Sequence, residues 1–308
     1  MLPGAIRPDG VVCLNCEAPL TGPFCAACGQ RDVPPYPSVR DLVVDAFWEL
    51  SGWDGRFAST VRALVQQPGL LTREFLEGRR ARYISPLRLY LMASLVYFVL
   101  AAAAPKASLT SGALAEVGGR AGTSAGSATL SRPERVGIAA RGAMTSDEAV
   151  SPADRAAALR DAERAPALVR PFLRRALGDP KGFKRGVVET MPRMLFALLP
   201  IFAAIIALFY RGRKYPEHLY FAIHFHAFLF LALGASALLR FTRLPLLAAA
   251  AGIIVVLWIP VYATLAFRRV YGGSVLRTLA KEAVIAAIYG ITSLVAFIAM
   301  VYWVSIAG

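Results

Sequence analysis

Five long apolar runs dominate the pattern of hydrophobic and polar positions along the chain. Each run has close to the roughly 20 residues that an α-helix needs to cross the hydrocarbon core of a bilayer. The runs occupy residues 87–104, 194–210, 219–239, 245–267 and 283–306. The pattern therefore predicts an all-α polytopic membrane protein, with one transmembrane helix at 87–104 and four more within residues 194–308.

Shorter amphipathic segments precede the first run, between residues 37 and 86. Apolar residues recur there at spacings of three and four, as on one face of a helix. The predicted helices span residues 39–50, 57–66 and 70–77. Three arginines follow them, Arg79, Arg80 and Arg82. We expect these helices at the cytoplasmic membrane surface, with the arginines on lipid headgroups. A small helical domain packed on itself is the alternative, and the two are compatible.

The segment 105–193 separates the first two apolar runs. Its first part, up to residue 150, is rich in Ala, Gly, Ser and Thr, a composition typical of disorder. Its later part has short helical patterns at 152–164 and 167–177. Six basic residues there indicate an amphipathic piece that lies on a surface: Arg170, Arg174, Arg175, Lys181, Lys184 and Arg185.

Composition narrows the class of protein. Hydrophobic residues make up 56% of the 308 residues and charged residues 18%, whereas soluble domains have about 45–50% and about 25%. Together with a mean hydropathy of +0.52, this excludes a soluble enzyme, a secreted disulfide scaffold and a disordered regulator.

The distribution of the basic residues along the chain, whose net charge is +14, sets the predicted topology. These residues gather at the ends of the apolar runs, so we expect no nucleic-acid partner. Eleven lie in the flanks and loops of one side, whereas the loop 240–244 on the other side has only Arg240 and Arg243. Because basic residues accumulate in cytoplasmic loops, the N-terminus is predicted in the cytoplasm and the C-terminus outside. The segment 105–193 is then extracytoplasmic.

All four cysteines fall in one motif, C-x2-C-x8-C-x2-C, within residues 11–31. They are Cys13, Cys16, Cys25 and Cys28. Each C-x2-C pair turns two thiolates toward one point, so two pairs complete a tetrahedral four-sulfur site. The motif predicts a small zinc ribbon whose zinc is structural, since no coordination position stays open. Free thiolates need a reducing compartment, which agrees with a cytoplasmic N-terminus.

Two of the three histidines lie in the third apolar run, and the third lies directly before it. With a neighbouring acid they form a possible intramembrane polar site of Glu217, His218, His224 and His226. At about 100° per residue, His224 and His226 point to nearly opposite sides of one helix and cannot share a metal ion. We favour imidazoles that hold neighbouring helices together by hydrogen bonds. A polar transport path and a headgroup or ligand contact are the alternatives.

Several stretches resemble a bacterial membrane family known as domain of unknown function 3667. They are residues 24–30, the motif 53–56, residues 77–86 with their arginines, Tyr83 and Pro86, the stretch 199–203, and the histidine-containing stretch 215–228. The resemblance covers about residues 13–104 and 190–240. It implies a cytoplasmic zinc ribbon joined to a core in the bacterial inner membrane, and it implies no established activity. The architecture is more loosely similar to that of the Yip1 superfamily.

The sequence shows no phosphate-binding loop, no Ser/His/Asp set and no carboxylate pair within the apolar runs. We therefore expect a non-enzymatic scaffold or adaptor among membrane lipids, with residues 1–86 as the module for a cytoplasmic protein partner. A transporter or channel with a path at Glu217, His224 and His226 is the alternative. A membrane enzyme acting on lipid or isoprenoid is a third hypothesis.

Overall fold

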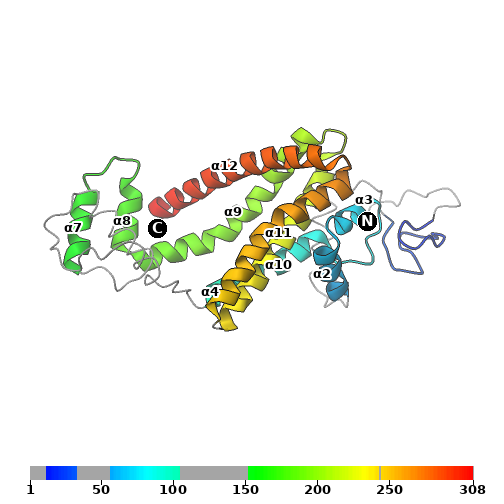
Figure 1. Cartoon of the computed structure of the whole chain (residues 1–308), viewed down its shortest axis with the longest axis horizontal. Helices are drawn as coiled ribbons and strands as arrows, with labels where there is room; N and C mark the ends of the chain where they lie inside the picture. The colour runs from blue at the N-terminus through cyan, green and yellow to red at the C-terminus, as the bar shows by residue number, and fades with distance from the viewer. Residues whose placement is uncertain (1–11, 33–55, 105–151, 243, 308) are drawn as a thin grey trace. The chain divides into compact units, whose positions relative to one another are not determined.

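The computed structural model describes residues 12–32, 56–104, 152–242 and 244–307 (Figure 1). The predicted helix at 39–50 and the predicted disordered stretch at 105–150 lie outside these residues. The chain divides into two compact units. The first unit comprises Met1–Ala107 and Leu199–Tyr289, and the second comprises Ser108–Leu198 and Gly290–Gly308.

Five helices of the described residues are long and apolar enough to cross a membrane, which confirms the predicted fold class. They are α4 (Pro86–Ala103), α9 (Pro180–Phe209), α10 (Tyr215–Leu238), α11 (Pro245–Tyr271) and α12 (Val275–Ala307). Several run beyond the apolar residues that predicted them. The protein is therefore a multi-pass membrane protein.

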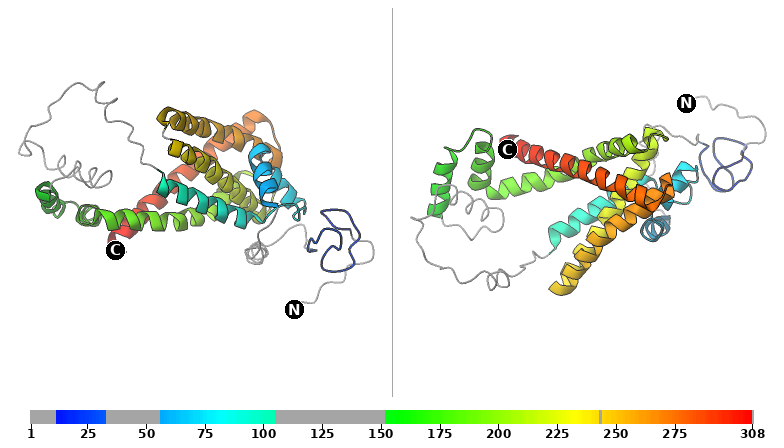
Figure 2. Two further views of the ribbon diagram at one scale, coloured as in Figure 1. Left: turned by 90° about the horizontal axis from the view of Figure 1, so that it is seen from below. Right: turned by 45° about the horizontal axis from the view of Figure 1, so that its top comes forward.

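Helix α10 forms the centre of the first unit, in contact with α3, α4 and α11 (Figure 2). Half of its most apolar stretch is buried inside the protein, against 11% for α11. A helix that is apolar all round belongs in a core, and α10 buries Phe221, Ala222 and Ile223 in succession. Helix α10 is therefore the element on which the others of this unit are placed.

The two short helices α2 (Arg56–Gln66) and α3 (Leu70–Leu76) pack against this core. The turn between them is closed by Gly69, whose φ of 74° is left-handed. A Cβ there would lie 2.8 Å from the carbonyl oxygen of Ala266 in α11, so only glycine fits. The Tyr262 hydroxyl of α11 also donates a hydrogen bond to Leu64 O, at 2.8 Å. Both short helices are thus fixed to the membrane core.

The second unit has a helical hairpin of α7 (Pro152–Ala162) and α8 (Arg170–Gly178). Its small core consists of Ala158, Ala162, Leu173 and Leu177. A second cluster joins Ala176 of α8 and Phe183 of α9 to Val304, near the end of α12. The hairpin therefore packs beside the last turns of a spanning helix.

Candidate metal centre and intramembrane polar contacts

The four cysteines of the predicted ribbon converge on one point. Their Sγ atoms all lie within 4.8 Å of one another. The Sγ atoms of Cys13 and Cys28 are 3.6 Å apart, and those of Cys16 and Cys25 are 3.5 Å apart. Metal–sulfur bonds of about 2.3 Å in a tetrahedron put the sulfurs about 3.8 Å apart. The cluster can therefore hold a metal ion with four thiolate ligands.

Local backbone geometry builds this site from two matching turns. The amide of Glu17 donates to Cys13 O at 2.8 Å, and the amide of Gly29 donates to Cys25 O at the same distance. Glu17 and Gly29 occupy the same place in the two turns, and both have positive φ, 61° and 71°. An isolated antiparallel bridge closes each turn. The repeated turn aims each cysteine pair at the metal position.

The side chain of Gln30 attaches the ribbon to the turn that follows α3. Its Nε2 donates to Gly78 O at 2.7 Å, and its Oε1 accepts from the amides of Arg80 and Ala81 at 3.0 and 3.1 Å. The backbone of Gln30 also accepts a hydrogen bond from the amide of Cys25, at 2.9 Å. One residue thus belongs both to the second metal turn and to the contact with the helical region.

A glycine completes this contact. Gly78 has a φ of 83°, and a Cβ there would lie 2.6 Å from the Leu14 side chain of the ribbon. Gln30 and Gly78 both occur in the stretches quoted for the family resemblance, but their pairing depends on side-chain geometry. This contact therefore could not be predicted from the sequence.

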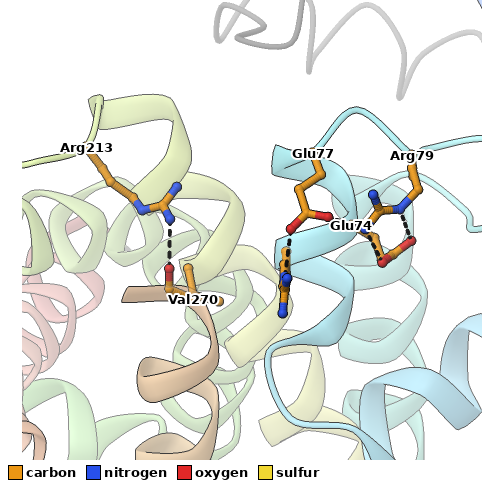
Figure 3. A network of polar contacts seen from close by, with 6 residues as sticks. Glu74, Glu77, Arg79, Arg213 and Val270 are labelled. Carbon is orange, nitrogen blue, oxygen red and sulfur yellow. Dashed lines mark hydrogen bonds and ion pairs between the residues drawn. The ribbon is translucent and has the colours of Figure 1, made fainter. Parts of the chain in front are cut away.

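The three arginines predicted on headgroups differ in their surroundings. Arg79 makes two hydrogen bonds to the Glu74 carboxylate, at 2.6 and 2.8 Å (Figure 3). It also pairs with Glu77. The hydrogen bond to Glu74 raises the pKa of Arg79, and the hydrogen bond from Arg73 lowers the pKa of Glu77.

The other two arginines contrast with each other. Arg80 donates through Nε to Phe75 O at 3.3 Å, and its two terminal nitrogens are buried. Arg82 is exposed. Of the three, Arg82 has the surroundings that a headgroup contact needs.

His224 joins α10 to α3. Its Nδ1 lies 3.0 Å from the Thr72 hydroxyl, and its ring meets the edge of Phe75 with centroids 5.5 Å apart. The imidazole is 3% exposed. Beside it lies a cavity of about 10 Å³, which is about the room that one water molecule requires.

His226 joins α10 to α12. Its Nδ1 lies 2.8 Å from Ala222 O, and its Nε2 lies 2.8 Å from the Tyr289 hydroxyl. A carbonyl can only accept, so Nδ1 carries the proton, and Nε2 of the neutral ring accepts from the tyrosine. Both ring nitrogens of His226 therefore have hydrogen-bond partners, and one of these bonds joins α10 to α12.

His218 and Glu217 make contacts near the start of α10. The Nδ1 of His218 lies 2.9 Å from the Tyr271 hydroxyl at the end of α11. Arg213 donates to Glu217 at 2.8 Å. It also donates to Val270 O at 2.9 Å (Figure 3). The four residues predicted as one polar site thus have separate partners, on α3, on α11, on α12 and in the turn before α10.

Comparison with protein families gives one match. Residues 54–98 match the model of a family described as protein of unknown function (DUF3667). The match includes α2, α3 and most of α4, and is narrower than the stretches that resemble the family in the sequence. The comparison with curated proteins found no match, and neither did the comparison with solved structures.

Proposed function

We propose that this protein is a non-enzymatic membrane scaffold or adaptor, and that its ribbon is an interaction module joined to the membrane core. The main support for this proposal is the contact of Gln30 with the turn at residues 78–81. Because α3 is bonded in turn to α10 through Thr72 and His224, the ribbon is connected to the spanning helices. A partner bound to the ribbon would be held at a fixed place on the membrane.

The ion that best suits the cysteine cluster is zinc. Four thiolates in a tetrahedron are a common structural zinc site, and they leave no coordination position for a substrate. A segment as short as residues 11–31 has little core of its own, so the metal would supply much of its folding free energy. This supports a structural role for the ion.

The partner surface that we propose is the exposed apolar part of the ribbon. Phe24 is 60% exposed and Val12 is 49% exposed, although both belong to the bridges that close the metal turns. Exposed apolar side chains on a rigid support favour a protein partner. We propose that this surface faces the cytoplasm of a bacterium and that the C-terminus lies outside the inner membrane; the accumulation of basic residues on the side of the N-terminus supports this orientation.

The transporter alternative needs a wetted path through the intramembrane polar residues. The partners of His224 and His226 favour a structural role, because each imidazole bonds a different neighbouring helix. The cavity beside His224 has room for about one water molecule.

Photo-crosslinking in native membranes tests the proposal. A photoreactive amino acid replaces Phe24 in the full-length chain, and the exposed Thr21 of the same ribbon is the matched control position. We expect a discrete crosslinked protein product from position 24 only, and its loss when Cys25→Ser removes a metal ligand. Equal products from both positions, or a product that survives Cys25→Ser, would contradict the proposal.

A further inference from the structure

Positive charge is segregated within the second unit. Helix α7 has two acidic and two basic residues, Asp154, Asp161, Arg155 and Arg160. Residues 168–188 have six basic residues and a single acid, Asp179. The surplus therefore belongs to α8 and the first turns of α9.

Contacts inside the unit leave this surplus in place. Asp179 pairs with Arg175 at 3.4 Å, and Glu163 pairs with Arg174 at 2.8 Å. Arg170 and Arg185 are exposed. The surface of α8 and the start of α9 is thus cationic.

Apolar side chains lie at the edge of this cationic surface. Leu168 is 73% exposed and Val169 is 43% exposed, directly before α8. Helix α8 itself buries other apolar side chains, Leu173, Ala176 and Leu177. The exposed pair is therefore additional to the apolar face that holds the hairpin together.

Aromatic residues at the end of α12 indicate how deep this surface lies relative to the bilayer. Tyr302 and Trp303 are exposed there, and such aromatics gather at the boundary between hydrocarbon and water. The next residue, Val304, packs on Ala176 and Phe183. A Cβ on Gly186 would lie 2.7 Å from Val304, so the first turns of α9 also pass here closely. We therefore expect helix α8 at the level of the lipid headgroups.

We infer that residues 168–188 form a binding surface for anionic phospholipid headgroups. Arg170, Lys184 and Arg185 contact the phosphates, and Leu168 and Val169 insert between the tops of the acyl chains. Each Lys or Arg close to an anionic membrane surface raises the affinity for that surface by about fivefold. The inference is independent of any partner of the ribbon.

The test uses the full-length chain in nanodiscs of phosphatidylcholine, with and without phosphatidylglycerol. An environment-sensitive fluorescent amino acid replaces Leu168. We expect its emission to shift to the blue with phosphatidylglycerol, and the shift to disappear at high salt because salt screens surface charge. The variant R170E/K184E/R185E should lose the dependence on phosphatidylglycerol. The milder K184Q/R185Q should lose about half of it and guards against misfolding.

The matched control is R155E/R160E on α7, which should keep the full lipid dependence. If the labelled protein with all its basic residues unchanged had the same emission with and without phosphatidylglycerol, the inference would be overturned. So would a loss in the α7 control as large as that in R170E/K184E/R185E. A shift caused by polyglutamate and not by phosphatidylglycerol would assign the surface to an acidic protein instead, and would also overturn it.

Discussion

The two metal turns of the ribbon place a residue with positive φ at equivalent positions, but the residues differ. Gly29 adopts this conformation without a steric cost, whereas Glu17 has a Cβ that disfavours it. The left-handed region costs a residue with a side chain about 1–2 kcal/mol. The first turn is therefore strained where the second is not.

This difference predicts opposite effects of two substitutions. Glu17→Gly should slow the loss of metal to a chelator, and Gly29→Ala should speed it, each by about fivefold for about 1 kcal/mol. The measurement is competition for zinc with a colorimetric chelator in the full-length protein. Equal metal retention in both variants would show that the φ values do not matter.

Sequence and structure agree best where spacing alone fixes the chemistry. The cysteines could be predicted from C-x2-C pairs, because a metal site needs ligands at short, repeated intervals. The role of Gln30 could not be predicted, because any polar residue after Gly29 is compatible with the motif. Its role depends on where the turn at residues 78–81 lies in space.

Among the helices, hydrophobic periodicity predicted the elements but not all of their ends. Helix α9 begins at Pro180 and α12 at Val275, well before their apolar runs. The 30 residues of α9 extend about 45 Å, whereas the hydrocarbon core is about 30 Å thick. Polar residues continue these helices into water, where hydropathy gives no signal.

The docking of α3 on α11 predicts a large effect at one glycine. Gly69→Ala adds a Cβ 2.8 Å from Ala266 O at a φ of 74°, so we expect a loss of about 2–4 kcal/mol from overpacking and backbone strain. Gly212→Ala is the matched control, because nothing lies within 4 Å of its Cβ position. Thermal unfolding in detergent compares them, and equal melting temperatures would refute the docking.

The hydrogen bond between α10 and α12 predicts a measurable coupling. His226→Ala and Tyr289→Phe should each destabilise the protein, and the double variant should lose less than their sum. The expected coupling is about 1 kcal/mol, as for other hydrogen bonds between membrane helices. A double-mutant cycle of unfolding measures it, and strict additivity would exclude the bond between Nε2 and the tyrosine hydroxyl.

At the scale of the molecule, the ribbon, the short helices and α10 form one chain of polar contacts in the first unit. Composition and the apolar runs could predict the spanning helices, because membrane insertion depends on summed hydropathy. They could not predict which spanning helix is central. The apolar run of α10, residues 219–239, is intermediate in length among the five, so its greater burial follows from packing.

Hydrogen exchange at the amides of Arg80 and Ala81 tests the central claim most directly. Both amides bond the Gln30 side chain, so they should be protected in the metal-loaded, full-length protein. Gln30→Ala should remove this protection and leave the four thiolates able to bind metal, and removal of the metal by a chelator should have the same effect on both amides. If these two amides exchanged as fast as unprotected amides in the unmodified protein, a ribbon joined to the membrane core would be contradicted. So would an exchange rate that neither Gln30→Ala nor metal removal changes.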